Sequence, residues 1–262
     1  MTGKHDVCEA NGLRIRYLRT GGDKPPIVLL HGLSGNGAVW TPIARALEAD
    51  FDVVMPDARA HGGSSTPLHG YRYDDLANDV EGVIRALRLA RPVLVGHSMG
   101  GMTAATLAGR RSAYLRGVVL VDPTFLTPER QREVRDSDVA DQHRRALGMT
   151  KEALVAERRA RQPHRSVEVI ELLVDAVLQT RMAAWDALTP PTPDYRNIVS
   201  AIDVPTLLVI GDAPVVTREV AADLCTVNKR MRVEEIANAG HGVPYDQPER
   251  LAEVIGAFAR SL

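Results

Sequence analysis

A serine flanked by glycines stands where an apolar run ends and a helical pattern begins. Ser98 lies in the stretch 96–101, G-H-S-M-G-G, after the apolar run 93–95 and before the small, apolar residues 102–108. A sharp turn between a strand and a helix leaves no room for a Cβ at positions 96 and 100, and it projects the serine hydroxyl outward. The amino end of the helix favours negative charge that develops there. The pattern predicts that Ser98 is the nucleophile of an acyl transfer.

A serine nucleophile needs a base within hydrogen-bond reach, and His241 is the candidate. It stands in the stretch 239–242, A-G-H-G, between the last, weak strand pattern and the last helical pattern. Loops that follow the strands of an open α/β sheet meet at one edge, where ligands bind. We therefore expect His241 and Ser98 to converge there, with the side chain of His97 pointing elsewhere. The histidines in polar stretches are expected to be solvated; these are His5, His69, His143 and His164.

The reaction also needs hydrogen-bond donors for the oxyanion that forms on the attacked carbonyl. The stretch His31-Gly32-Leu33 follows the first long apolar run, and Gly32 lets the backbone turn back toward the serine. The residue after the nucleophile commonly supplies one donor. We therefore expect the backbone N–H groups of Leu33 and Met99 to bind the oxyanion, and we interpret His31 as a residue that holds the loop in place.

These residues need a scaffold, and the hydrophobic pattern predicts one. Short apolar runs without alternation are typical of strands buried on both faces of a parallel sheet. These runs are 27–30, 53–55, 93–95, 118–121, 207–210 and, more weakly, 233–236. The segments 7–10 and 13–18 flank Asn11-Gly12, which is a hairpin signal. Helical patterns cover residues 38–48, 73–89, 102–108 and 248–262. This alternation predicts an α/β fold, with a mostly parallel, twisted sheet and helices on both faces.

The alternation stops between about residues 124 and 193. This stretch has no strand-like run, it is rich in Arg, Glu and Ala, and it ends at the sequence P-P-T-P. We interpret residues 124–193 as a helical cap inserted into a core formed by residues 1–123 and 194–262. An alternative is a solvated helical bundle with no role in binding. If the insertion covers one end of the sheet, it shapes the pocket around Ser98.

Composition narrows the possible partners. The 262 residues carry a formal net charge of −1, which gives no electrostatic reason to expect nucleic acid or an anionic membrane as a partner. Cys8 and Cys225 lack metal-ligand spacing, and we expect two reduced thiols.

No run approaches 18 apolar residues, and the first residues lack the apolar segment of a signal peptide, so a cytoplasmic location is expected. No phosphate-binding loop or metal cluster is present, so neither cofactor nor metal is implied. The oligomeric state is left open.

Four motifs in order resemble the α/β-hydrolase superfamily over nearly the whole chain. They are His31-Gly32 with Trp40 downstream; the stretch 57–64, which is similar to D-x-R-G-x-G-x-S with Ala60 in place of a glycine; G-H-S-M-G-G at 96–101; and Gly240-His241-Gly242. The subgroup that shares G-H-S-M-G-G comprises small bacterial esterases, lactonases and cofactor-free perhydrolases. The resemblance implies an α/β-hydrolase fold and a triad of serine, histidine and acid, with Asp57 and Arg59 structural and Gly32 and Trp40 beside the substrate.

The acid of the triad is not settled by the resemblance. Relatives usually read G-x-x-D after the penultimate strand, but here Pro214 stands where the acid is expected. Asp212 is one candidate, if the shortened turn brings it round. Asp122 is the other, because some relatives, the haloalkane dehalogenases among them, carry the acid directly after the sixth strand, and residues 116–122 resemble that segment. A chain without a working acid is the third alternative.

The sequence therefore predicts a metal-free serine hydrolase that cleaves a carboxylic ester or lactone through an acyl-enzyme. Trp40, Phe125 and Trp185 are candidate pocket residues, with a place in the core as the alternative for each. Two other functions stay open: hydrolysis of a carbon–carbon bond in a vinylogous diketone, and a non-catalytic small-molecule receptor on the same fold. Dehalogenase and epoxide hydrolase chemistry is set aside, because both need a carboxylate where this chain has Ser98.

Overall fold

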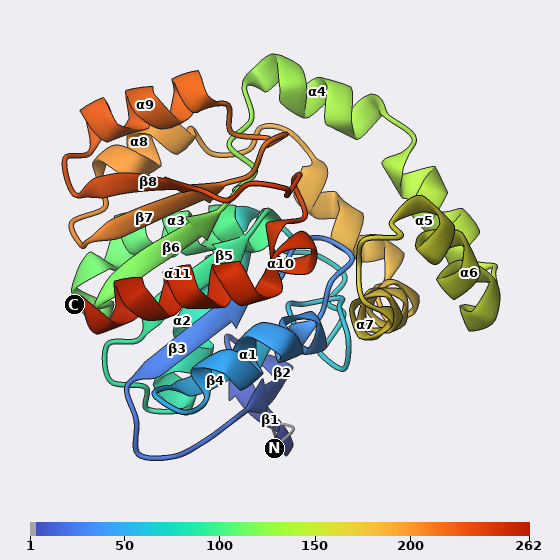
Figure 1. Ribbon diagram of the computed structural model, residues 1–262, viewed down its shortest axis with the longest axis horizontal. Coiled ribbons are helices and arrows are strands. Elements are labelled where there is room, and N and C mark those ends of the chain that lie inside the picture. The colour runs from blue at the N-terminus through green and yellow to red at the C-terminus, as the bar shows by residue number, and fades with distance from the viewer. Residues whose placement is uncertain (1–3) are drawn as a thin grey trace.

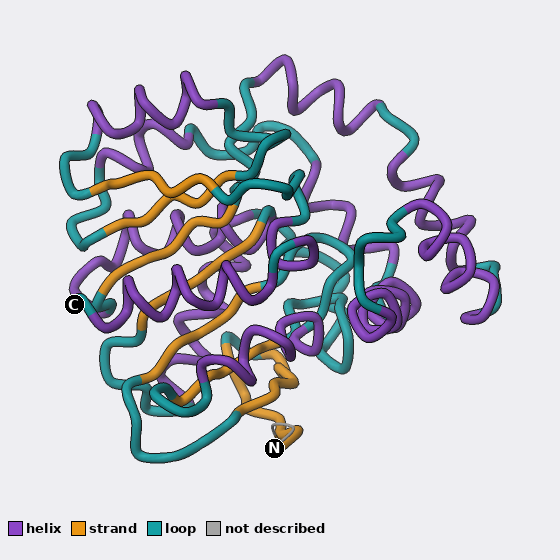
Figure 2. The backbone as a smooth tube through the Cα atoms, viewed as in Figure 1, coloured by secondary structure: helices purple, strands orange, loops and turns teal. Residues whose placement is uncertain are grey.

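The computed structural model describes residues 4–262 and contains an eight-stranded sheet with helices on both sides (Figures 1 and 2). The strands are β1 (Lys4–Ala10), β2 (Leu13–Arg19), β3 (Pro26–Leu30), β4 (Asp52–Pro56), β5 (Val93–His97), β6 (Gly117–Val121), β7 (Thr206–Ile210) and β8 (Met231–Glu235). Their order across the sheet is β1-β2-β4-β3-β5-β6-β7-β8. Pairs that involve β2 are antiparallel and the others are parallel. The predicted fold class is confirmed.

The hairpin predicted at Asn11-Gly12 joins β1 and β2. Both residues have positive φ, 50° and 74°, which is the conformation of a type I′ turn. The turn sets the register, in which Ala10 pairs with Leu13 at the closed end. The hairpin forms the antiparallel edge of the sheet.

Helices cover both faces of the central strands. The core helices are α1 (Thr41–Leu47), α2 (Tyr73–Ala86), α3 (Met99–Arg111), α8 (Tyr195–Ser200), α9 (Arg218–Val227), α10 (Val243–Asp246) and α11 (Pro248–Arg260). Side chains of α1 and α11 pack on one face, and those of α2, α3, α8 and α9 pack on the other. Because both faces are covered, β4, β5, β6 and β7 are buried along their whole length, which explains their unbroken apolar runs.

Residues 124–193, called here the helical segment, contain no strand. They form α4 (Pro128–Asp136), α5 (Val139–Leu147), α6 (Lys151–Arg161), α7 (Val167–Leu178) and a 3₁₀ helix, Met182–Leu188. Figure 1 shows these helices to one side of the sheet, beyond the ends of its strands. Among residues 4–262, no helix combines the length and apolarity that a membrane span requires.

Candidate active site

Ser98 occupies a strained turn between β5 and α3. Its backbone angles are φ 54° and ψ −117°, outside the regions that a serine ordinarily adopts. A Cβ on Gly96 would overlap the carbonyl oxygen of Gly100, and a Cβ on Gly100 would overlap that of Leu30. The glycines therefore permit the close crossing of helix and strand that forces the serine outward.

Ser98, His241 and Asp122 form a chain of hydrogen bonds. His241 Nε2 lies 3.0 Å from Ser98 Oγ, and His241 Nδ1 lies 2.6 Å from Asp122 Oδ2. A carboxylate only accepts hydrogen bonds, so Nδ1 carries the proton and Nε2 presents a lone pair to the serine hydroxyl. The Asp122 side chain is fully buried, whereas that of His241 is 41% exposed. This geometry is that of a serine activated by a general base.

The orienting carboxylate is supported by the loop after β7. The backbone N–H groups of Val215 and Val216 each donate to Asp122 at 2.9 Å. Asp122 itself has a φ of 38°, and its N–H bonds to the carbonyl of Val209. The loop in which relatives carry an acid thus supplies two amide donors to the acid at the end of β6.

Asp212, the other candidate acid, does not contact His241. Its carboxylate accepts a hydrogen bond of 2.6 Å from the N–H of Asn238, and its own N–H bonds to the carbonyl of Ala239. Both contacts lie on the loop between β8 and His241. Asp212 is exposed, and its two hydrogen bonds tie this loop to the end of β7.

Two residues beside the serine have a backbone N–H group without an acceptor among residues 4–262. They are Leu33 and Met99, which both line the cavity that contains Ser98. The loop of Leu33 lies close to the serine, since a Cβ placed on Gly32 would be 3.2 Å from the Cβ of Ser98. Both residues thus lie beside the cavity of Ser98 with a backbone donor that no acceptor in residues 4–262 engages.

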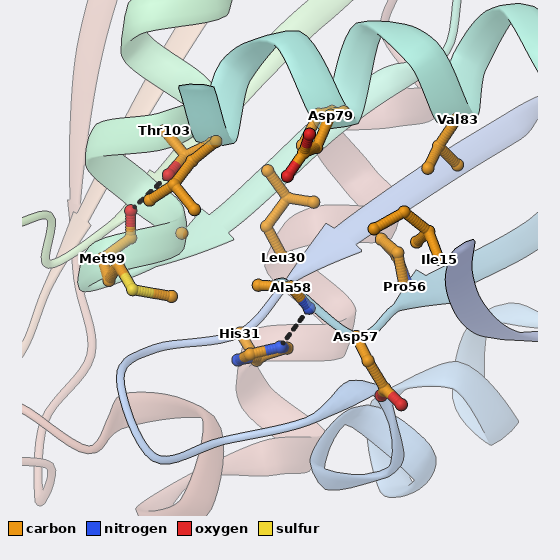
Figure 3. A pocket seen from close by; sticks show the side chains of 13 residues that line it. Ile15, Leu30, His31, Pro56, Asp57, Ala58, Asp79, Val83, Met99 and Thr103 are labelled. Atoms are coloured by element: carbon orange, nitrogen blue, oxygen red, sulfur yellow. Dashed lines mark hydrogen bonds between the residues drawn. The ribbon is translucent and has the colours of Figure 1, made fainter. Parts of the chain in front are cut away.

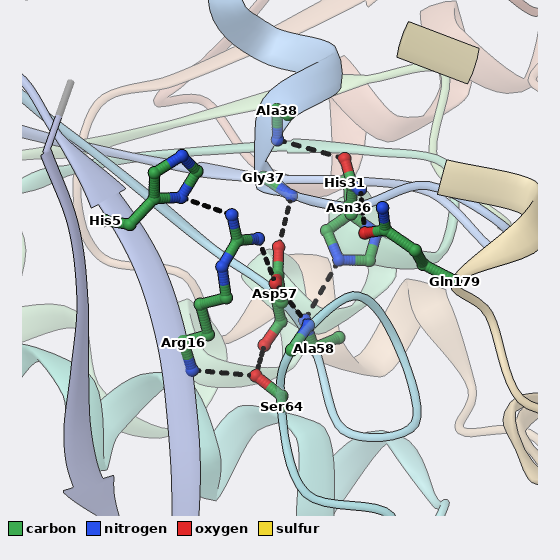
Figure 4. Close-up of polar contacts among 11 residues, drawn as sticks. His5, Arg16, His31, Asn36, Gly37, Ala38, Asp57, Ala58, Ser64 and Gln179 are labelled. Carbon is green, nitrogen blue, oxygen red and sulfur yellow. Dashed lines mark hydrogen bonds and ion pairs between the residues drawn. The ribbon is translucent and has the colours of Figure 1, made fainter. Parts of the chain in front are cut away.

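Buried polar contacts hold this loop. His31 Nε2 accepts from the N–H of Ala58 at 3.0 Å (Figures 3 and 4). Its Nδ1 donates to the carbonyl of Gly32 at 2.8 Å. Burial lowers the pKa of His31, so the ring is neutral and can act as donor and acceptor at once. Asp57 accepts from Gly37 N–H and from Arg16 Nη1 (Figure 4). Through these contacts His31 and Asp57 hold the backbone of the loops in place.

His97 contacts the histidine loop through its backbone. Its Nε2 donates to the carbonyl of His241 at 2.8 Å, while Nδ1 is buried without a partner in the described chain. Burial, with a further contribution from His241, lowers the pKa of His97 to about 3. No pattern in the sequence indicates that this neutral ring would hold the backbone of His241.

A cavity of about 750 Å³ opens beside Ser98 and His241. Core loops form one wall, and the helical segment forms the other with residues that include Leu126, Val177 and Trp185. Phe125 also lines it.

Trp40 does not line the cavity. Its side chain is 1% exposed and lies in the core between α1 and the sheet, so its predicted place beside the substrate is wrong. The presence of an aromatic residue in the sequence does not show whether its side chain lies in the core or in the cavity wall.

The expectation of a solvated His143 is also wrong. Its ring stacks on Trp185 with 4.0 Å between the ring centres, and its Nε2 bonds to the carbonyl of Thr180 at 3.0 Å. Burial lowers its pKa. The polar neighbours of His143 in sequence lie on the other faces of α5, whereas this face meets the 3₁₀ helix. The predicted exposure of His5, His69 and His164 is correct.

A second cavity lies beneath His31, between β3 and α2 (Figure 3). Its volume is about 30 Å³ and its lining is mostly apolar, with Ile15, Leu30 and Val83 among its residues. It has room for one or two water molecules and not for a substrate.

One ion pair connects the helical segment to the loop of His241. Arg165 Nε lies 2.7 Å from Asp246 Oδ1, and both side chains are at most 10% exposed. The other carboxylate oxygen accepts from the N–H of Gly240. Burial alone would raise the pKa of Asp246, but hydrogen bonds from Arg165 and His164 hold it below its usual value.

The chain is similar in sequence to a known family and to individual known proteins. A family model described as alpha/beta hydrolase fold matches residues 25–248. The 2-(acetamidomethylene)succinate hydrolase of Mesorhizobium japonicum is 35% identical over 120 residues, 46% of this chain and 42% of that protein. The match therefore spans less than half of that relative.

Two further matches extend over nearly the full length. The N-formylmaleamate deformylase of Pseudomonas putida is 28% identical over 253 residues, 95% of this chain and 94% of the relative. The crystal structure of the enol-lactonase from Burkholderia xenovorans superposes with a TM-score of 0.80 and 25% identity, covering 97% of this chain and 100% of that one.

Proposed function

Because the chain belongs to the alpha/beta hydrolase fold family, we propose that it is a serine hydrolase that cleaves a carboxylic ester or lactone of a small molecule. The observation that carries the proposal is the hydrogen-bonded chain from Ser98 Oγ through His241 to the buried carboxylate of Asp122. The names of the relatives, a hydrolase, a deformylase and an enol-lactonase, support hydrolysis of an acyl compound.

In the first half-reaction Ser98 is acylated. Its Oγ attacks the carbonyl carbon while the hydroxyl proton passes to Nε2 of His241, and the carbonyl oxygen becomes an oxyanion held by the N–H groups of Leu33 and Met99. Collapse of the tetrahedral intermediate breaks the bond to the leaving oxygen, which takes the proton from Nε2. Asp122 remains a carboxylate and stabilises the imidazolium.

In the second half-reaction water releases the acyl group. His241 takes a proton from the water as its oxygen attacks the ester carbon, and then returns a proton to Ser98 Oγ as the acid leaves. The products are a carboxylic acid and an alcohol, or a single hydroxy acid when the substrate is a lactone. Each step uses a group already aligned in the hydrogen-bonded chain.

The receptor alternative depended on the lack of an acid beside His241. The carboxylate of Asp122 at 2.6 Å removes that reason. Hydrolysis of a vinylogous diketone by the same three residues would require groups that hold an enolate, and it is tested by offering such a diketone beside a series of p-nitrophenyl esters.

The test is mass spectrometry after treatment with a fluorophosphonate probe. We expect a single adduct on Ser98 that is absent from Ser98→Ala. Ser34 lines the same cavity, so Ser34→Ala is the matched control and should still be labelled. No adduct on the folded wild type, or an adduct on another residue, would rule out the proposal.

A further inference from the structure

The cavity beside Ser98 is lined by cations and by no acid. Among the described residues in its wall, two are arginines, Arg130 and Arg158, and none is aspartate or glutamate. Arg130 pairs with Glu133 at 2.6 Å, and both side chains are more than 60% exposed, so water and an acid already compensate its charge. Arg158, on α6, is the cation that remains.

The guanidinium of Arg158 has no ion pair or hydrogen bond within residues 4–262. Glu157, the one acid whose charge acts on it, pairs with Arg161 at 2.9 Å, and the neighbouring Arg165 pairs with Asp246 at 2.7 Å. Arg158 is only partly exposed, and its burial, together with the charge of Arg165, lowers its pKa. An arginine nevertheless keeps its charge, so a partly buried and unpaired guanidinium is costly until an anion binds it.

We propose that Arg158 binds a free carboxylate of the substrate while Ser98 attacks the ester or lactone carbonyl of the same molecule. The inference rests on the proposed function and adds to it a substrate class, esters or lactones that bear a carboxylate away from the bond that is cleaved. A planar guanidinium matches the two oxygens of a carboxylate. One unpaired arginine balances one negative charge, which favours a carboxylate over a phosphate dianion.

The lining of the cavity that holds both Ser98 and Arg158 indicates what joins the two ends of the substrate. Leu126, Ala146 and Val177 contribute apolar surface to the cavity. The linking part of the molecule is therefore expected to be a carbon chain or ring without further charge. Its length is the variable that an experiment can scan.

The experiment compares mono-p-nitrophenyl esters of succinic, glutaric, adipic and pimelic acid with the same esters capped as methyl esters. For one length, we expect wild-type kcat/KM on the free acid to exceed that on the capped ester by about tenfold or more, since a hydrogen-bonded ion pair is lost with the charge. Arg158→Gln should lose about ten- to hundredfold on the free acid and stay within about twofold on the capped ester.

The matched control is Arg159→Gln. Arg159 is the next residue on α6, is exposed, and does not line the cavity, so this variant should keep the preference for the free acid. Circular dichroism and thermal unfolding establish that both variants fold.

Each outcome decides the proposal separately from the proposed function. Equal kcat/KM on free and capped esters in wild type, or a preference that survives Arg158→Gln, overturns the role of Arg158 but leaves ester hydrolysis standing. A stronger preference for phosphonate-ended esters would overturn the carboxylate assignment. If no ester is cleaved, calorimetric titration of Ser98→Ala with monomethyl glutarate, adipate and pimelate decides the matter, because binding that does not weaken on adding Arg158→Gln, or no binding at all, refutes the inference.

Discussion

Strands β4, β5, β6 and β7 bury every residue, whereas helices α4, α5 and α6 of the helical segment each bury one, namely Gln131, His143 and Leu154. The ion pairs differ in the same way. Arg59 and Asp79 pair in the core with side chains at most 7% exposed, while the pairs on α4 and α5 join side chains that are mostly in water. Exposed pairs of that kind contribute about 0–1 kcal/mol each.

This difference in burial separates the groups proposed to react, which lie in the core, from the cavity wall proposed to bind substrate, which lies in the helical segment. The reacting groups, Ser98, Asp122 and His241, lie at the ends of buried strands or on loops bonded to them. The opposite wall of the cavity belongs to the segment with fewer buried contacts. Regions with few buried contacts open locally at a lower free-energy cost than the core does. Catalytic geometry and substrate fit should therefore respond differently to substitution.

The largest expected effect tests whether the chemistry depends on the core. Asp122→Asn should lower kcat by about 10⁴, because an amide cannot hold the imidazole in the required tautomer or stabilise its charge. Steady-state hydrolysis of a p-nitrophenyl ester measures this. Asp212→Asn is the control and should change kcat by no more than about threefold, since Asp212 bonds only to backbone N–H. A larger loss with Asp212→Asn would reassign the acid.

Two leucine substitutions compare the stability of the regions. Leu94→Ala, in the fully buried β5, should lower the free energy of unfolding by about 2–5 kcal/mol, through lost burial and the cavity that remains. Leu154 packs in a separate, smaller cluster with Ile170 and Val174. Leu154→Ala should therefore accelerate hydrogen exchange mainly within the helical segment. Equal acceleration in the strands would show that both regions unfold as one unit.

The buried histidines make core stability depend on pH. Burial lowers the pKa of His61 and of His97 to about 3, so the folded state holds both rings neutral while the unfolded chain protonates them below about pH 6.5. The unfolded state binds the extra protons, and the free energy of unfolding should fall by about 1.4 kcal/mol per pH unit for each ring as the pH drops from 6.5 toward 3.

Denaturant unfolding at a series of pH values measures this slope. His97→Gln keeps an amide donor for the carbonyl of His241 and should remove the share of one ring. His69→Gln, at an exposed loop position, is the control and should leave the slope as it is. A slope that is unchanged by His97→Gln would mean that another group titrates.

The smallest expected effect concerns a contact between the regions. Ala60 has a φ of 61°, and its carbonyl accepts from the N–H of Arg181 in the helical segment. The left-handed conformation costs an alanine about 1–2 kcal/mol, and the extra freedom of glycine in the unfolded chain offsets about 0.5–1 kcal/mol of the relief. Ala60→Gly should raise the free energy of unfolding by at most about 1.5 kcal/mol. A fall would indicate that the alanine methyl packs favourably.

Predictions from the sequence succeeded where the signal is local. Unbroken apolar runs placed β3 to β7, and Asn11-Gly12 placed the hairpin, because strand burial and turn conformation depend on neighbouring residues. The glycines around Ser98 indicated its turn for the same reason. The helix α9, Arg218–Val227, was not predicted from the sequence.

Predictions failed or stayed open where the answer depends on contacts between distant segments. Asp122 and His241 are 119 residues apart, and Asp212 is equally able to reach the same edge of a sheet on sequence grounds alone. Trp40 and His143 were misplaced because the direction in which a side chain points depends on how its helix packs, and not on the polarity of its neighbours.

The order of residues along the chain thus specified the α/β architecture, the family, and the serine and histidine that stand at strand ends, since each is written in short patterns of burial and turn geometry. Three features followed from folding alone: the choice of carboxylate beside the imidazole, the neutral ring of His97 that bonds to the backbone of His241, and an Arg158 side chain without a partner in residues 4–262. Each of these depends on a few ångströms between segments that the backbone brings together from far apart.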